Sequence, residues 1–433
     1  MSLEQTSLTP AIQFLGSLMI KMKEEKKALC RLCRSSQLVS ILKLASTPPA
    51  NAFVSKENTK YEQTIYPLEL FLCENCSHVQ LVEVVNPIEL FENYVYVSGT
   101  SPVFVEHFLN YAKTIIETYK PSLKSYILDI GSNDGTLLKF FQKMGYSTIG
   151  VDPAIDISQK AQEDGVHTIN EFFNLDTSIK IKERYSTASL ITANNVFAHS
   201  DDLIGITKAV KNLLSKEGLF IFEVSYLVDV YQKTLFDTIY HEHLSYHSVL
   251  PLVKFFQRHD MELIDVSRVN THGGSIRCVV KNIEDKRPIN NSVQNLLDLE
   301  KSLSLNEKET FINFANNIKE RKKELRNFIN KIKAQNKSIA GFGAPAKATT
   351  LMYEFELENN VLDFIVDDSP LKQGLFSPGL NIPILPSSAI SELKPDYLLI
   401  LAWNFADSIV KKNHEFIESG GKFIIPLPNL QII

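Results

Sequence analysis

Four of the five cysteines form two C-x-x-C pairs: Cys30 with Cys33, and Cys73 with Cys76. Thiolates two residues apart on a tight turn can share one cation, and two such pairs complete the closed tetrahedral shell of structural zinc. The sequence therefore predicts a small amino-terminal zinc domain whose metal serves folding and offers no open position to a substrate. Four unrelated buried or redox-active thiols are the alternative. Cys278 stands alone in an apolar run and is expected to be inert core.

Length and charge exclude several classes of protein. With 433 residues, about three domains are expected. The 45 basic and 50 acidic residues leave a net charge of −5, which does not favour a nucleic-acid partner. No apolar run reaches membrane-spanning length, and the apolar stretch 11–22 overlaps and precedes the basic cluster 21–27, the reverse of a secretory signal. We expect a soluble cytoplasmic protein without a membrane partner.

A glycine loop follows the apolar run 126–130 and precedes a helical pattern at 136–144. This order predicts a strand, a tight turn and a helix. Glycine allows the backbone to approach a ligand at positive φ, and the start of the helix offers unpaired amide donors. The candidate ligand-binding residues of this loop are Asp129, Gly131, Asn133 and Gly135.

A second predicted strand, 147–151, is followed by Asp152, whose carboxylate can accept hydrogen bonds from two ribose hydroxyls. The loop has the spacing G-x-x-x-G and not the G-x-G-x-x-G of dinucleotide-binding proteins, which favours a nucleoside without a pyrophosphate at the turn. S-adenosylmethionine fits this description. The alternative is a tight turn followed by a surface aspartate.

Further strands are predicted at 188–193 and 218–224, followed by 261–269 and 275–281. Because ligands of open α/β sheets bind at the carboxyl ends of strands, His199 and Glu223 are expected at the active edge. The short connection within 261–281 implies an antiparallel hairpin. A parallel sheet completed by one antiparallel strand is the order of class I methyltransferases, so we predict that α/β fold.

The densest titratable cluster is Y-H-E-H at 240–243, followed by His247. Histidine can act as a general base near neutral pH, and a neighbouring carboxylate can fix its tautomer. We favour acid–base catalysis here. Two alternatives remain: a second metal site, although the H-E-x-x-H spacing of zinc hydrolases is missing, and a structural polar cluster.

The carboxyl-terminal part predicts connecting helices at 288–337 and a second, smaller doubly wound unit with strands at 337–342, 361–366, 397–402 and 422–426. After the first of these strands, the loop containing Gly343 and Lys347 offers backbone amides and a cation, a combination suited to a diphosphate. Packing alone could also explain the loop. Weaker candidates at the next strand end are Asp367, Asp368, Lys372 and Gly374.

Taken together, the cysteine pairs and the motifs at 93–101, 129–135, 194–199, 240–243 and 271–277 resemble the sugar C-methyltransferases of deoxysugar pathways, over about residues 29–428. The resemblance implies a zinc-binding domain, a class I methyltransferase Rossmann-like domain and a second Rossmann-like domain. It also implies S-adenosylmethionine-dependent methylation at carbon 3 of a nucleotide-diphosphate-linked 4-keto-6-deoxysugar. We accordingly expect an extension at 1–28 and domains at 29–95, 96–283 and 337–433, with a helical connection at 284–336.

The resemblance also assigns roles to single residues. It implies that His243 is the base at carbon 3, that Tyr240 and Glu242 lie beside it, and that Tyr94 and His199 line the sugar site. Asn194 and Asn195 are expected at the cofactor, and the remaining substrate candidates are Ser98, Thr100, Glu223, His272, Gly343 and Lys347. A monomer is expected, because three domains can close their own cleft. The alternatives are a non-catalytic nucleotide-sugar binding protein and a methyltransferase acting on oxygen or nitrogen of a small molecule.

Overall fold

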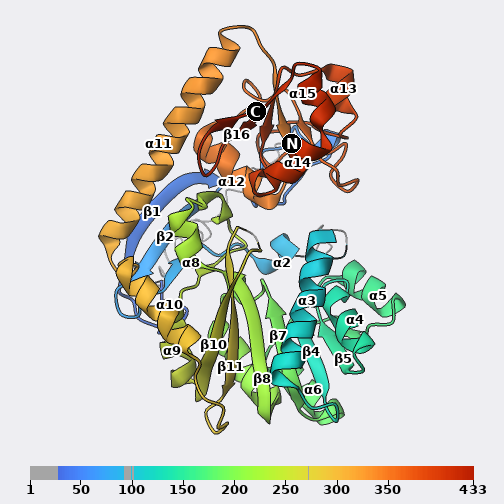
Figure 1. Cartoon of the computed structure of the whole chain (residues 1–433), viewed down its shortest axis with the longest axis vertical. Helices are drawn as coiled ribbons and strands as arrows, with labels where there is room; N and C mark the ends of the chain where they lie inside the picture. Colours follow the sequence, from blue (N-terminus) through green and yellow to red (C-terminus); the bar gives the residue numbers. More distant parts are fainter. Residues whose placement is uncertain (1–27, 92–98, 100–101, 272) are drawn as a thin grey trace, which may run out of the picture.

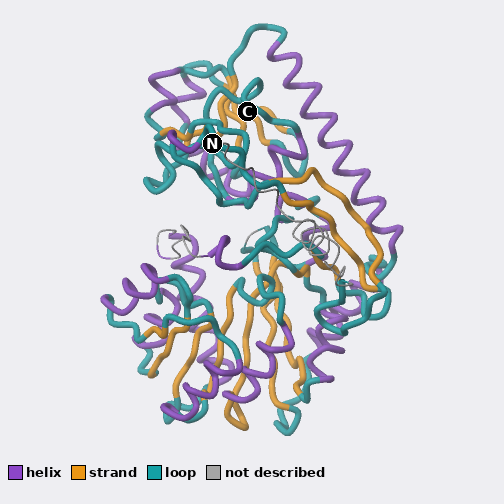
Figure 2. The backbone as a smooth tube through the Cα atoms, turned by 180° about the vertical axis from the view of Figure 1, so that it is seen from behind, coloured by secondary structure: helices purple, strands orange, loops and turns teal. Residues whose placement is uncertain are grey.

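A computed structural model describes residues 28–91, 99, 102–271 and 273–433 of the chain. Figure 1 shows two lobes, with the long helix α11 (Lys308–Lys333) running along one side from the lower lobe to the upper. Strand β1 (Leu38–Thr47) packs against α11, and Figure 2 shows the two side by side between the lobes. Within the described residues, every helix is too short or too polar to cross a bilayer.

The lower lobe contains a seven-stranded sheet in the order β10-β11-β8-β7-β4-β5-β6. In chain order the strands are β4 (Tyr126–Ile130), β5 (Ser147–Val151), β6 (Thr168–Ile169), β7 (Ala188–Asn194), β8 (Leu214–Ser225), β10 (Met261–Val269) and β11 (Ser275–Asn282). Strands β4 to β8 pair in parallel, whereas β11 runs antiparallel to both β8 and β10. This arrangement confirms the predicted class I methyltransferase fold and its terminal hairpin.

Both faces of this sheet are covered by apolar side chains, as expected for a parallel sheet with near-continuous apolar strands. On β4, Ile127 belongs to one core cluster, whereas Leu128 and Ile130 belong to the other, because successive strand side chains point to opposite faces. The helices of this lobe are α3 (Pro102–Tyr119), α4 (Thr136–Lys143), α5 (Ile155–Glu163), α6 (Leu175–Tyr185), α7 (Leu203–Leu213), α8 (Leu227–Gln232) and α9 (Val249–Arg258). Helix α3 packs in the cluster of Ile127. Helices α7 and α9 contribute to the other cluster.

The amino-terminal domain is built on a four-stranded antiparallel sheet in the order β1-β2-β3-β9. Cys73 is the last residue of strand β2 (Tyr66–Cys73), and Cys76 lies in the turn before strand β3 (Val79–Leu81). The 3-10 turn η1 (Lys56–Asn58) precedes these strands, and helix α2 (Pro87–Phe91) follows them. The fourth strand, β9 (Ser245–Tyr246), comes from the segment directly after His243. The titratable cluster of the sequence is therefore joined to the cysteine domain by main-chain hydrogen bonds.

The upper lobe is a six-stranded sheet in the order β14-β13-β12-β15-β16-β17. Its elements are β12 (Ile339–Phe342), α12 (Ala346–Phe355), β13 (Ile365–Val366), β14 (Ile384–Leu385), α13 (Ala389–Leu393), β15 (Tyr397–Ile400), η4 (Trp403–Phe405), α14 (Ala406–Lys412), α15 (His414–Glu418), β16 (Lys422–Ile425) and β17 (Gln431–Ile432). All pairs are parallel except β16 with β17. The predicted second Rossmann-like unit is confirmed. The chain reaches it through α10 (Asn291–Ser302) and α11.

The predicted strand at 361–366 is shorter in the structure, where only Ile365–Val366 pairs with its neighbours. The amides of Val361 and Leu362 instead donate to the carbonyl of Glu358, which forms a turn. The side chains of Val361 and Leu362 are nevertheless buried. An apolar run predicts burial, but it does not distinguish a buried turn from a strand.

Candidate active site

The four predicted metal ligands lie together. The Sγ atoms of Cys30, Cys33, Cys73 and Cys76 are all within 4.8 Å of one another. Each pair sits on the same kind of turn: the amide of Arg34 donates to the carbonyl of Cys30, and the amide of Ser77 donates to the carbonyl of Cys73. Arg34 and Ser77 both have positive φ, 60° and 68°. Two equivalent turns with four converging thiols fit a closed tetrahedral zinc site.

The glycine loop closes over the carboxyl end of β4. Gly131 has φ +66°, and a Cβ atom there would lie 2.4 Å from Cγ2 of Val196. Gly135 has φ +73°, and a Cβ atom there would lie 2.8 Å from Cγ2 of Val166. Only glycine fits either position without displacing a neighbour. Since Val196 belongs to the predicted 194–199 segment, the structure brings two of the expected cofactor segments into contact.

Two carboxylates at this edge have different environments. Asp152 accepts hydrogen bonds from the amides of Asn133 (2.8 Å) and Ala154 (2.9 Å), and burial raises the pKa of its carboxyl. These two bonds leave further lone pairs on the carboxylate for a ribose diol. Asp129 accepts a 2.6 Å bond from the hydroxyl of Thr192, and burial raises its pKa to about 7. Asp129 therefore has a partner within the sheet, and Asp152 is the better placed of the two for a nucleoside.

The segment after β7 turns back toward β8. Asn194 is the last residue of β7, and Asn195, with φ 57°, donates its amide to the carbonyl of Glu223 over 2.8 Å. The amide of His199 then donates to the carbonyl of Val196, which closes the turn. This geometry directs His199 toward the titratable cluster, where the ring centroids of His199 and His243 lie 5.0 Å apart.

His243 is fixed by a hydrogen bond on each ring nitrogen. Its Nδ1 lies 2.7 Å from the carbonyl of Thr238, an acceptor, so Nδ1 carries the proton. Burial lowers the pKa of His243 to about 4, so the ring is neutral near pH 7. The lone pair therefore lies on Nε2, 3.0 Å from the hydroxyl oxygen of Tyr240, which donates to it.

Glu242, between the two histidines of the motif, points into a different environment. Its Oε1 accepts a 2.7 Å hydrogen bond from Nδ2 of Asn51, in the amino-terminal domain. The side chain is almost fully buried, and desolvation raises its pKa to about 7. Asn51 was not singled out from the sequence. Nothing in the pattern P-P-A-N around it connects it to a residue 191 positions later.

The remaining histidines of the cluster have structural environments. Nε2 of His241 lies 3.2 Å from the carbonyl of Pro67. His247 is buried, with its ring stacked on Phe197 at 5.6 Å between centroids. Among the described residues, the four cysteines are the only group of three or more His, Cys, Asp or Glu side chains close enough together to hold a metal ion. The alternative of a second metal site at 240–247 therefore finds no support there.

Two predicted substrate residues are engaged with other side chains. Glu223 is buried and accepts from His107 (2.7 Å) and from Arg277 (2.7 Å). The side chain of Lys347 is 12% exposed, with its Nζ 3.7 Å from Oδ2 of Asp237 and 4.1 Å from the ring centroid of Trp403. The structure thus places Lys347 where the upper lobe meets the segment leading to Tyr240.

The glycine loop of the upper lobe resembles that of the lower lobe in its geometry. Gly343 has φ +86°, and a Cβ atom there would lie 2.6 Å from Cβ of Ala402. The amide of Ala344 donates to Oδ2 of Asp367 over 2.7 Å, and Nζ of Lys372 donates to the carbonyl of Ala344. Asp367 and Lys372 therefore hold this loop in place.

Four predicted site residues, Tyr94, Ser98, Thr100 and His272, lie outside the described residues. Gly99, within the same motif, is described, and its amide donates to Oδ2 of Asp134 over 3.0 Å. Within the described residues, Gly99 therefore joins this motif to the glycine loop after β4.

Comparison with known proteins identifies the family. The chain is 32% identical over 404 residues to the C-methyltransferase NovU of Streptomyces niveus, an alignment that covers 93% of this chain and 96% of that protein. The chain belongs to the C-methyltransferase family. Three family models also match: "Putative zinc binding domain" at 30–91, "Methyltransferase domain" at 105–266 and "C-methyltransferase C-terminal domain" at 270–428.

Solved structures also show similarity to this C-methyltransferase. A SAM-dependent methyltransferase from Anabaena variabilis is 12% identical, with a TM-score of 0.32, and the match covers 41% of this chain and 94% of that one. An S-adenosylmethionine-dependent methyltransferase from Clostridium acetobutylicum is 14% identical, with a TM-score of 0.32, over 41% and 92% of the two chains.

As a class I methyltransferase, the enzyme uses S-adenosylmethionine as methyl donor, and zinc is the ion of its four-cysteine domain. The residues present fit both groups. The backbone cradle at Gly131 and the buried carboxylate of Asp152 suit a nucleoside, and four clustered thiols suit zinc.

Proposed function

We propose that this enzyme methylates carbon 3 of a nucleotide-diphosphate-linked 4-keto-6-deoxysugar, with His243 as the base. The observation that carries the proposal is the hydrogen bonding of His243: Thr238 holds its Nδ1 proton, so its lone pair lies on Nε2 beside the Tyr240 hydroxyl. A hydrogen next to a ketone becomes acidic only if a base meets it and a donor meets the carbonyl oxygen. A neutral imidazole paired with a phenol supplies both groups.

The proposed proton transfer balances as follows. The bond between carbon 3 and its hydrogen breaks, the proton moves to Nε2 of His243, and the electron pair forms the enolate of carbons 3 and 4. Tyr240 turns its hydroxyl from Nε2 to the enolate oxygen. S-adenosylmethionine, when bound, supplies an electrophilic methyl group to carbon 3. A pKa near 4 keeps His243 unprotonated beforehand, and the adjacent enolate charge offsets the cost of the buried imidazolium.

In this proposal, the upper lobe binds the nucleotide part of the substrate. In the loop 343–346, the amides of Gly343 and Ala344 are already engaged, and Pro345 has no N–H, so the donors for a diphosphate would be the amides of the first residues of α12, Ala346 and Lys347. Lys347 ties this loop to Asp237, which is three residues before Tyr240. The ion pair between Lys347 and Asp237 would thereby connect the nucleotide site to the segment that carries Tyr240 and His243. A monomer in the cytoplasm belongs to the same proposal.

Product analysis tests the proposal. The enzyme is incubated with S-adenosylmethionine and each of several nucleotide-linked 4-ketosugars, and products are examined by mass spectrometry and heteronuclear NMR. We expect a gain of one methylene in mass and methyl protons that correlate with carbons 2, 3 and 4. A methyl ether or methylamine product would contradict the assignment to carbon. Failure to bind S-adenosylmethionine in calorimetric titration would instead favour a non-catalytic sugar-binding protein.

A further inference from the structure

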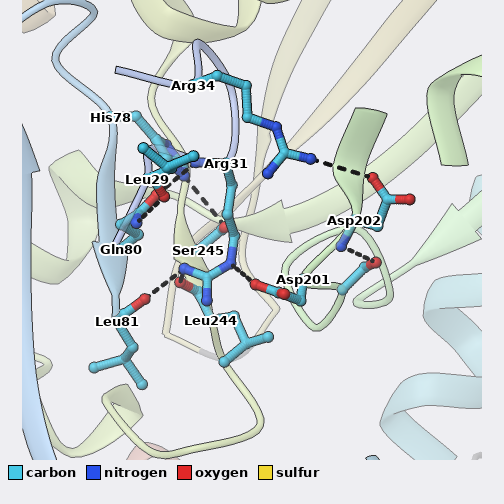
Figure 3. A network of polar contacts seen from close by, with 11 residues as sticks. Leu29, Arg31, Arg34, His78, Gln80, Leu81, Asp201, Asp202, Leu244 and Ser245 are labelled. Carbon is cyan, nitrogen blue, oxygen red and sulfur yellow. Dashed lines mark hydrogen bonds and ion pairs between the residues drawn. The ribbon is translucent and has the colours of Figure 1, made fainter. Parts of the chain in front are cut away.

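Arg31, inside the first cysteine pair, is buried to an unusual degree for an arginine, with 4% of its side chain exposed. Its backbone is fixed from two sides. The amide of Arg31 donates to Oε1 of Gln80 over 2.8 Å, and Nε2 of Gln80 donates to the carbonyl of Leu29. Figure 3 shows this network around the guanidinium. The turn that presents Cys30 and Cys33 therefore also sets where the guanidinium points.

The guanidinium meets both segments that carry the paired histidines. Its Nε donates to Oδ1 of Asp201 over 2.9 Å, and one terminal nitrogen donates to the carbonyls of Leu81 and Leu244. Leu244 directly follows His243, and Asp201 is two residues after His199. A planar group with five donors in a fixed arrangement can hold two such segments at a set separation.

The fold does not need this arginine to pair the strands. The amide of Leu81 already donates to the carbonyl of Leu244, and the amide of Ser245 donates to the carbonyl of Ala198. Burying a cation costs free energy that a well-packed apolar side chain would avoid. The one carboxylate partner, Asp201, is largely exposed, so this ion pair returns little of that cost. What Arg31 adds is orientation of the two loops.

We propose that Arg31 is a positioning residue that sets the separation of His199 and His243, with the Cys30–Cys33 turn as its support. The zinc site then has a second role beyond folding: it holds the residue that aligns the two histidines. This inference rests on the proposed function for its kinetic test, although the histidine geometry can be tested without substrate.

The test compares Arg31→Lys with Arg34→Lys in the zinc-loaded enzyme. A lysine ammonium at position 31 cannot reach Asp201 and Leu244 in the same fork geometry. Because displacements near 1 Å can cost about a hundredfold in rate, we expect kcat to fall roughly tenfold to a hundredfold. KM for both substrates and zinc per chain should stay unchanged. Arg34 is the matched control, since it lies in the same turn, is half exposed, and is 3.9 Å from Asp202.

A second readout follows the histidines directly. With ¹³C-labelled histidine, the ring signals of His199 and His243, assigned with His199→Asn and His243→Asn, should shift in Arg31→Lys and stay in place in Arg34→Lys. Asp201→Asn removes only the exposed end of the network and should shift the His199 signal with a smaller loss of kcat. If Arg31→Lys fails to fold, Asp201→Asn still tests whether the network positions the histidines.

The outcomes separate the two proposals. An unchanged kcat or unchanged histidine signals in Arg31→Lys would overturn the positioning role, as would a loss of zinc in proportion to activity. If the parent enzyme does not methylate the ketosugars, the proposed function fails, and the histidine signals alone decide the role of Arg31.

Discussion

Replacing Glu242 by glutamine should make the enzyme more stable at alkaline pH. Burial raises the pKa of Glu242 from 4.5 to about 7, so the folded protein holds this proton more tightly than the unfolded chain. The stabilisation is fully present below pH 4.5 and is lost as pH rises through about 7. Glutamine has no proton to lose, and its Oε1 can still accept from Nδ2 of Asn51.

The magnitude follows from the two pKa values. The pKa values of Glu242 in the folded and unfolded protein differ by about 2.5. Since a difference of one in pKa corresponds to about 1.4 kcal/mol, the full effect on the free energy of unfolding is about 3 kcal/mol. Between about pH 5.5 and about pH 8, the stability of Glu242→Gln relative to the parent should rise by about 2 kcal/mol. For a cooperative unit the size of the lower lobe, this corresponds to roughly 4 to 8 °C in Tm.

The assay is thermal unfolding of parent and variant at both pH values. A constant offset between glutamate and glutamine cancels in this comparison, so only the change with pH is informative. Glu320→Gln, on the exposed face of α11, is the control and should follow the parent at both pH values. If the Tm difference between Glu242→Gln and the parent is the same at both pH values, the reasoning about a buried, nearly neutral carboxyl is refuted.

Two further predictions concern the bound groups. Gly131→Ala places a methyl group 2.4 Å from Cγ2 of Val196, on a backbone with φ +66°. We expect the affinity for S-adenosylmethionine, measured by calorimetry, to weaken at least tenfold, by about 1.4 kcal/mol. Unchanged affinity would refute the proposed cradle. Cys73→Ser should lower the zinc content measured by plasma mass spectrometry and lower Tm, and a variant with a full complement of zinc would contradict the four-thiolate site.

The fold was largely predictable because its signals are local. The strand, glycine turn and helix at 126–144 follow from apolar runs and glycine positions, and the antiparallel hairpin follows from a short connection within 261–281. The pairing of β9 with β3 was not predictable. Ser245 and Tyr246 are too short a segment for an alternating pattern to predict a strand. Their partners on β3 also lie more than 160 positions earlier in the chain.

The site was predictable in its residue types and less so in its contacts. The tautomer of His243 depends on the carbonyl of Thr238, a main-chain group that every sequence contains. The acidity of Glu242 depends on burial beside Asn51, and the orientation of Lys347 depends on Asp237. The contacts of Glu242 and Lys347 are made where separate domains meet. Motif spacing describes a loop, but it does not describe what another domain places against it.

The account depends most on removal of the carbon 3 proton by His243, and solvent-deuterium exchange measures that step alone. A nucleotide-linked 4-keto-6-deoxysugar that the enzyme methylates is incubated in deuterated buffer with the protein and without methyl donor. The parent should exchange the carbon 3 hydrogen well above the uncatalysed rate, and His243→Asn should lose at least about a hundredfold of that excess while binding S-adenosylmethionine normally. Exchange at the parent rate in His243→Asn would contradict the account.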